Sequence, residues 1–201
     1  MKRLQHGLRR RTDRVALLRR LPKRGLGVEV GVWEGDFSSQ LLRWNKPKQL
    51  HLVDPWRYID ADGYERAVFG GGRISGYGAS DQAGMDDLHR GVVARFAPQC
   101  AAGQVAIHRM PSAEAAAELV TFPFDWAYID GDHTYQAVKT DLENFWTLVK
   151  PGGVLAGDDY GVKGWWNDGV TQAVDEFVAA HDAAVEHFGA QFLIRKPGLS
   201  K

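Results

Sequence analysis

Two short apolar stretches of the chain each end in a pair of carboxylates, and these residues are the best placed to carry chemistry. Asp130 and Asp132 follow one stretch, and Asp158 and Asp159 follow the other after a helix-length interval. If the stretches form neighbouring parallel strands, their carboxyl ends lie side by side and the four side chains converge with His133. Four carboxylates in one place repel one another unless a cation lies among them or some are protonated. The spacing therefore predicts a hard-metal site with an adjacent base at the carboxyl edge of an α/β sheet.

Each aspartate also has a plain structural role open to it. Asp130 can end its strand in a turn, and Asp132 can cap the helix that follows. Asp158 and Asp159 can form an exposed turn. Capping and turns account well for any one of these residues. They do not account for four aspartates after two adjacent strands, with His133 directly after Asp132. We therefore take the metal site as the working hypothesis.

A glycine-containing turn after an earlier strand indicates a ligand site of a different kind. Residues 27–32 are typical of a buried strand, and Gly31 and Gly35 make the turn into a helix expected from residue 37. Glycine lets the backbone pass close to a ligand, and a helix N-terminus offers free N–H groups. Glu29 can pair with a cationic group such as the ammonium of an amino acid. The spacing Glu-x-Gly-x-x-x-Gly differs from the Gly-x-Gly-x-x-Gly of dinucleotide sites, which argues against a dehydrogenase.

Two further residues are candidates for binding a nucleoside. Asp54 ends a second buried strand at 50–53, and an acid at that place commonly holds ribose hydroxyls. Ser112 begins an alanine-rich helix, where the turn often borders the base in a nucleoside-binding fold. Simple helix capping accounts for Ser112 equally well.

The remaining pattern alternates between strands and helices. Helices are expected over 85–96, ending before Pro98, over 135–149 and over 170–188, and strands over 104–108, 125–130, 154–157 and 191–195. This order predicts one Rossmann-like, doubly wound α/β domain with a mostly parallel sheet. We divide the chain into a basic, helical N-terminal segment, 1–24, and a domain over 25–201. A Gly- and Tyr-rich insertion at 57–83 is interpreted as a lid or substrate-specificity segment.

Composition limits the classes of partner. The 201 residues carry equal numbers of basic and acidic side chains, so the formal net charge is zero. A neutral chain has no overall field that attracts nucleic acid or membrane. The single cysteine, Cys100, fits a reducing compartment, and no apolar stretch suits a signal peptide or a membrane span. We expect a cytoplasmic protein without a membrane partner, and we leave homo-oligomer formation open.

Taken together, four motifs resemble class I S-adenosylmethionine-dependent methyltransferases. They are Val-Glu-Val-Gly-x-x-x-Gly, Leu-Val-Asp-Pro-Trp, Tyr-Ile-Asp-Gly-Asp-His-x-Tyr and Lys-Pro-Gly-Gly-Val-x-x-Gly-Asp-Asp-Tyr, in order over about residues 26–160. The likeness is strongest to the metal-dependent sugar and macrolide O-methyltransferases of the macrocin O-methyltransferase type. Catechol and caffeoyl-CoA O-methyltransferases are more distant.

This resemblance implies a role for each candidate residue. The cofactor S-adenosylmethionine would be bound at Glu29, Gly31, Gly35, Asp54, Ser112 and Asp130. The metal, Mg²⁺ or another divalent cation, would be held by Asp130, Asp158 and Asp159. In the relatives, the base follows the first metal aspartate by two or three positions, which implies Asp132 or His133. We favour His133 as the catalytic base, because a neutral imidazole can take a proton once a metal holds the charge, and we keep Asp132 as the alternative.

The expected function is magnesium-assisted methyl transfer to a hydroxyl of a small molecule, such as a sugar, a glycosylated natural product or a related metabolite. Two alternatives stay open. One is an RNA methyltransferase that uses the basic N-terminal segment as a clamp, and the other is a non-catalytic nucleoside-binding or partner-binding module with the same fold.

Overall fold

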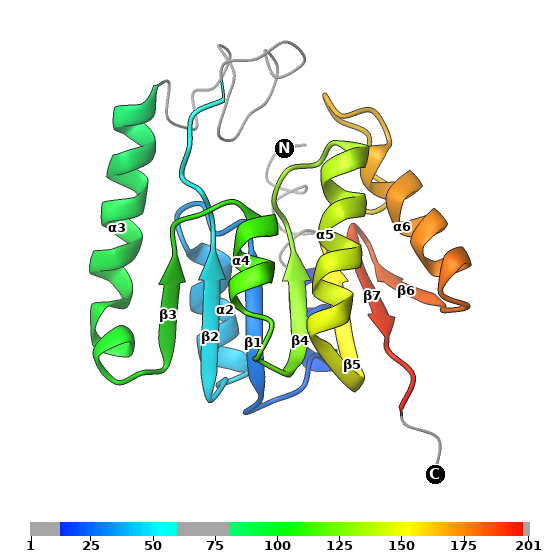
Figure 1. Cartoon of the computed structure of the whole chain (residues 1–201), viewed down its shortest axis with the longest axis horizontal. Helices are drawn as coiled ribbons and strands as arrows, with labels where there is room; N and C mark the ends of the chain where they lie inside the picture. Colours follow the sequence, from blue (N-terminus) through cyan, green and yellow to red (C-terminus); the bar gives the residue numbers. More distant parts are fainter. Residues whose placement is uncertain (1–12, 60–80, 199–201) are drawn as a thin grey trace, which may run out of the picture.

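The computed structural model describes residues 13–59 and 81–198 and contains one seven-stranded sheet. The strand order is β3-β2-β1-β4-β5-β7-β6, and only β7 runs against the other strands. The strands are β1 Leu26–Val30, β2 Gln49–Val53, β3 Val105–His108, β4 Phe124–Ile129, β5 Val149–Gly157, β6 Val185–Phe188 and β7 Gln191–Arg195. The predicted doubly wound, mostly parallel α/β fold is confirmed (Figure 1).

Helices cover both faces of the sheet (Figure 1). The helices are α2 Asp36–Trp44, α3 Gln82–Ala101, α4 Ser112–Glu118, α5 Tyr135–Leu148 and α6 Gly169–Ala180, and residues 13–20 are also helical. Helices α4, α5 and α6 form one apolar core with the sheet, whereas α2, α3 and the 13–20 helix form another. Strand β4 shows why its sequence is apolar throughout: Ala127 and Ile129 face the first core, and Trp126 and Tyr128 face the second.

The order of the strands reverses between β1 and β4. Strand β1 leads through α2 to β2 on one side, while β4 continues through α5 to β5 on the other. Loops at such a reversal diverge from each other and leave room for a ligand at the carboxyl edge. Three non-glycine residues just beyond strand ends at this edge have positive φ, namely Trp33, Trp56 and Asp159. Left-handed backbone is costly for bulky residues and tends to cluster at functional sites.

Two expected helix boundaries were wrong. The helix expected over 170–188 ends at Ala180, and Val185–Phe188 instead form β6, which turns back tightly into β7. Val185 and Phe188 continue the helical period of α6, so the pattern alone hides the change. The helix expected to end before Pro98 runs on to Ala101 with Pro98 inside it, because one missing N–H near a helix end removes only a single backbone hydrogen bond.

The described part of the N-terminal segment is docked on the domain. Leu17, Leu18 and Leu21 are almost fully buried in the core shared with α2 and α3. The first part of the basic segment and most of the 57–83 insertion lie outside the described residues. Within 13–59 and 81–198, no helix is both long enough and apolar enough to cross a membrane.

Candidate active site

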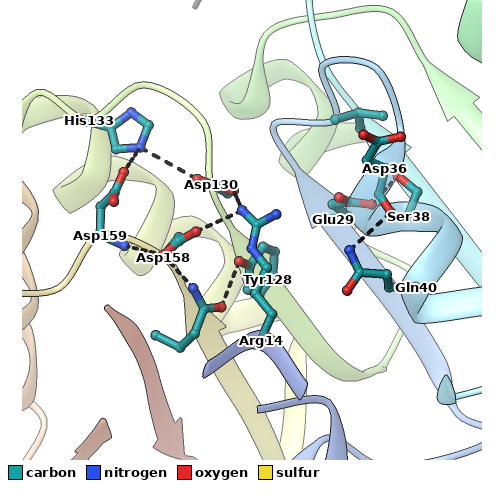
Figure 2. A network of polar contacts seen from close by, with 12 residues as sticks. Arg14, Glu29, Asp36, Ser38, Gln40, Tyr128, Asp130, His133, Asp158 and Asp159 are labelled. Carbon is teal, nitrogen blue, oxygen red and sulfur yellow. Dashed lines mark hydrogen bonds and ion pairs between the residues drawn. The ribbon is translucent and has the colours of Figure 1, made fainter. Parts of the chain in front are cut away.

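The ends of β4 and β5 bring the predicted acidic residues together. Asp130 follows β4, Asp158 and Asp159 follow β5, and the two strands are parallel neighbours. Figure 2 shows that the side chains of Asp158 and Asp159 diverge, with Asp159 directed to His133 and Asp158 to Arg14. The left-handed φ of 63° at Asp159 accompanies this divergence of two adjacent side chains. The predicted convergence of strand ends is therefore present, but the three carboxylates have different surroundings.

His133 lies between two of these carboxylates. Its Nε2 atom is 2.9 Å from Asp159 Oδ2 and 3.5 Å from Asp130 Oδ1. Burial lowers the pKa of His133, but the interactions with Asp130 and Asp159 outweigh burial and raise the pKa to about 10. In this arrangement His133 is an imidazolium that balances the carboxylates, so it cannot yet act as a base.

The Asp158 side chain accepts hydrogen bonds from three other groups of the protein. Its Oδ2 atom accepts a hydrogen bond from Arg14 at 2.8 Å, and its Oδ1 atom accepts one from the backbone N–H of Asp159 at 2.8 Å. The amide of Gln191, on β7, also donates to Oδ1, and Tyr128 in turn donates to Gln191 at 2.9 Å. Burial and the nearby Asp130 raise the pKa of Asp158 to about 6.

Arg14 is a site residue that the sequence reasoning missed. It belongs to the 13–20 helix, yet its Nη2 atom donates to Asp130 Oδ2 at 3.1 Å and to Asp158 Oδ2 at 2.8 Å. Its guanidinium also lies over the Phe37 ring, 4.9 Å from the ring centre. One signal was present in the sequence. Arg14 precedes Leu17 and Leu18 by three and four positions, so it lies on the same helix face as these buried leucines.

The other predicted base, Asp132, lies in the turn before α5. Its Oδ1 atom accepts a hydrogen bond from the backbone N–H of Thr134 at 2.8 Å. This contact fits the turn-forming role considered for Asp132 from the sequence, and a carboxylate keeps further acceptor sites. Trp166, from the loop before α6, packs on His133 with ring centres 4.6 Å apart.

Glu29 lies across the edge of the sheet from this cluster, at the end of β1 (Figure 2). The side chain is 1% exposed, and Ser38 of α2 donates a hydrogen bond to Glu29 Oε2 at 2.6 Å. Burial raises the pKa of Glu29 to about 8, although the bond from Ser38 opposes that rise. At neutral pH the free protein therefore holds a protonated Glu29. A cationic ligand arriving nearby would favour its ionised form.

The two glycines of the predicted turn are required by the chain itself. Gly31 has a φ of 87°, and a Cβ atom there would lie 2.0 Å from the backbone oxygen of Asp130. Gly35 has a φ of 79°, and its Cβ would lie 2.7 Å from the ring of Phe96 on α3. Gly31 thus brings the loop after β1 against the backbone of Asp130. The two candidate half-sites, one at Glu29 and the glycine turn and the other at the acidic cluster, therefore lie next to each other.

Asp54, the predicted ribose ligand, organises the same loop. Asp54 Oδ2 accepts hydrogen bonds from the backbone N–H groups of Val32 and Trp33 at 2.9 and 3.0 Å. Asp54 Oδ1 accepts one from the N–H of Trp56 at 2.7 Å. These bonds oppose the effect of burial, which raises the pKa of Asp54. A carboxylate has about four acceptor positions, so these bonds leave about one for a ligand, and the ribose role stays a prediction.

Ser112 is the first residue of α4 rather than its cap. The N-cap is Pro111, and the Ser112 side chain is hydrogen-bonded to the buried carboxyl of Asp141 on α5. Burial raises the pKa of Asp141 to about 6, with the bond from Ser112 opposing that rise. Ser112 therefore ties the α4 turn to α5, and its place beside an adenine ring stays a prediction.

The donors around His133 fit a divalent cation. One oxygen each of Asp130 and Asp159 and one ring nitrogen of His133 lie within 4.8 Å of one another. His133 Nε2 is buried and lacks an aligned hydrogen bond. When ionised, the cluster with Asp158 carries three negative charges, against two positive charges on Arg14 and protonated His133. Carboxylate oxygens such as those of Asp130 and Asp159 suit a cation such as Mg²⁺ or Mn²⁺, with the imidazole of His133 beside it.

Solved methyltransferase structures share this fold at low sequence identity. A putative caffeoyl-CoA O-methyltransferase from Staphylococcus aureus has a TM-score of 0.63 at 12% identity, over 94% of this chain and 82% of its own. A putative rRNA methylase from Clostridium thermocellum has a TM-score of 0.63 at 9% identity, over 94% and 96%. The O-methyltransferase TomG from Streptomyces achromogenes, solved with SAM, has 0.58 at 15% identity, over 96% and 80%. At these identities the likeness establishes the fold alone.

The sequence itself carries the family assignment. No curated protein matches the chain. Residues 28–160, more than half of the chain, match the family model described as a methyltransferase domain. This segment contains both half-sites, from Glu29 at the end of β1 to Asp159 after β5. The resemblance to class I methyltransferases is thereby confirmed, and the chain belongs to the methyltransferase domain family.

Proposed function

We propose that the protein is an S-adenosylmethionine-dependent O-methyltransferase that transfers a methyl group to a hydroxyl of a small molecule with the help of Mg²⁺. One observation carries this proposal. The candidate cation site of Asp130, His133 and Asp159 lies directly beside the glycine turn after β1, where Gly31 approaches the backbone of Asp130. A donor held at the turn and an acceptor held at the cluster would meet at the same edge of the sheet.

On the donor side, S-adenosylmethionine supplies a sulfonium methyl group, and the chain supplies the contacts that hold it. Glu29 would bind the ammonium of the methionine part, because an ionised carboxylate is the natural partner of a buried cation. The turn at Gly31 and Gly35 leads into α2, whose first N–H groups attract a carboxylate. Asp54 has acceptor capacity left for a ribose hydroxyl.

The pKa of Glu29 gives this donor site a measurable signature. With a pKa of about 8, Glu29 is mostly protonated at pH 7 in the free protein. Binding of a cationic donor should release close to one proton per site at pH 7, and the release should fade as the pH rises through 8. Calorimetric titration with S-adenosylmethionine in buffers of different ionisation enthalpy measures this number. The Glu29→Gln variant should bind about tenfold more weakly or worse and release no proton. Full proton release in that variant would assign the proton to another group.

On the acceptor side, a bound magnesium ion would stabilise negative charge on the acceptor oxygen. Of the three predicted ligands, Asp130 and Asp159 would hold this ion, because Asp158 is bonded to Arg14. A divalent cation that shared these carboxylates would weaken the interactions that raise the pKa of His133 and leave burial, which lowers it. A neutral His133 would then be able to take the proton of the hydroxyl. Trp166, packed on His133, would exclude water. Asp132 stays the alternative base.

The RNA alternative depends on the basic N-terminal segment. Among the described residues of that segment, Arg14 is bonded to Asp130 and Asp158, and Arg20 is bonded to Glu186. Side chains already paired within the chain are poor candidates for a phosphate clamp. The RNA alternative therefore depends on the other basic residues of the segment, such as the exposed Arg19, Lys23 and Arg24.

The proposal is tested by following conversion of S-adenosylmethionine over a panel of sugars, phenols and glycosides. We expect an O-methyl product, loss of turnover in excess chelator, and recovery when Mg²⁺ is restored. Full turnover in chelator would remove the metal from the mechanism. Methylation of amines or RNA in place of hydroxyls would contradict the acceptor class.

A further inference from the structure

Arg14 connects the N-terminal helix to the acidic cluster across a very large separation in sequence. Leu17 and Leu18 bury the helix against the sheet, and Arg14 lies one turn earlier on the same face. Its guanidinium packs on Phe37, whose neighbour Ser38 bonds Glu29. A side chain clamped between an aromatic ring and two carboxylates has little freedom, so Arg14 holds a fixed positive charge between the two half-sites.

The two oxygens of Asp130 face different cations (Figure 2). Asp130 Oδ2 accepts from Arg14 at 3.1 Å, whereas Asp130 Oδ1 lies 3.5 Å from His133. Asp158 shares the guanidinium at 2.8 Å, and Asp159 is paired with the imidazole at 2.9 Å. The cluster is therefore divided into a guanidinium half with Asp158 and an imidazole half with Asp159, and Asp130 belongs to both.

We propose that Arg14 is a positioning residue that acts as a permanent cation of the acidic cluster. Arg14 keeps Asp158 bonded to itself and confines the divalent ion to Asp130 and Asp159, next to His133. This inference rests on the proposed function, because it concerns the magnesium ion named there. Taking Asp158 away from Arg14 would leave the half-buried guanidinium with Asp130 as its one remaining carboxylate among those described here, which is costly. A fixed positive charge so close to the ion also weakens its binding. Metal affinity is thus coupled to docking of the N-terminal helix, and Asp158 is not a metal ligand.

The test measures Mn²⁺ binding by electron paramagnetic resonance, which counts free Mn²⁺ and needs no turnover. Arg14→Gln removes the charge and should bind Mn²⁺ at least about tenfold more tightly than the wild type. Arg14→Lys keeps the charge and should stay within about threefold of the wild type. Arg20→Ala, on the same helix but paired with Glu186 at the surface, is the matched control and should leave the affinity unchanged. Equal affinity in the wild type and in Arg14→Gln would overturn the role of Arg14 and leave the metal proposal standing.

A second pair of variants tests the division of the cluster without changing Arg14. Asp159→Asn should weaken Mn²⁺ binding by about fiftyfold or more, whereas Asp158→Asn should weaken it by less than about fivefold. Equal losses would overturn the division. If only Arg14→Gln binds Mn²⁺, the blocking role of Arg14 is supported and metal assistance in the intact protein fails. If neither the wild type nor Arg14→Gln binds Mn²⁺ at millimolar concentration, both proposals fail.

Discussion

Replacing Asp130 with asparagine should lower turnover by about a thousandfold while leaving the protein folded. Asp130 is the one carboxylate that contacts both Arg14 and His133 among the described residues. The amide keeps the shape of the side chain but removes the negative charge that would hold a divalent ion. In the metal-free protein the same charge helps to keep His133 protonated. Steady-state kinetics with the O-methyl acceptor, together with Mn²⁺ affinity, measures the effect.

Stability distinguishes this catalytic role from a structural one. Asp130 stands near Asp158 and Asp159, so removing its charge relieves repulsion as well as breaking ion pairs. The melting temperature of Asp130→Asn should therefore fall by no more than about 5 °C. Asp87→Asn, an exposed change on α3, should alter neither turnover nor melting. Near-normal turnover in Asp130→Asn would contradict the acidic cluster as the acceptor site.

Replacing Gly31 with alanine should destabilise the protein by about 4 kcal/mol or more. Two causes combine at this position. The φ of 87° is unfavourable for any residue with a Cβ atom, and the added atom would lie 2.0 Å from the backbone oxygen of Asp130. Backbone cannot move aside as a flexible side chain can, so β1 and β4 must separate at the edge where both half-sites lie. Denaturant unfolding monitored by fluorescence measures the loss, and donor affinity should fall with it.

Gly152→Ala separates the two causes. Gly152 has a φ of 78°, but nothing lies within 4 Å of its added Cβ atom. This variant should show the cost of the backbone angle alone, about 1–2 kcal/mol. Equal losses in Gly31→Ala and Gly152→Ala would mean that the close approach to Asp130 is not important, and the adjacency of the two half-sites would lose its support.

The fold and the imidazole half of the site could be predicted from local patterns. Short apolar stretches bounded by turns identified most of the strands, and their alternation with helices favours a mostly parallel sheet. Parallel neighbours must present their carboxyl ends at one edge, so Asp130, Asp159 and His133 had to meet there. Gly31 and Gly35 could be identified because a tight turn between a strand and a helix favours glycine, which adopts positive φ at no steric cost.

What escaped prediction depends on contacts distant in sequence. Arg14 lies 116 residues from Asp130 and 144 from Asp158, and its basic neighbours made it look like one of many surface charges. Gln191, which holds Asp158 from β7, gave no signal of its own in the strand. For β6, the helical spacing of Val185 and Phe188 was misleading, because pairing with β7 overrides local periodicity.

The central claim is that Asp130 and Asp159 hold a divalent ion beside a methyl donor. A crystal grown with S-adenosylhomocysteine and Mn²⁺ tests both parts at once, because Mn²⁺ is located by anomalous scattering. The account predicts one anomalous peak at about 2.0–2.3 Å from oxygens of Asp130 and Asp159, with the amino group of the ligand at Glu29. The account would be contradicted if S-adenosylhomocysteine were fully bound but no anomalous peak lay at the acidic cluster, with Arg14 still bonded to Asp130 and Asp158.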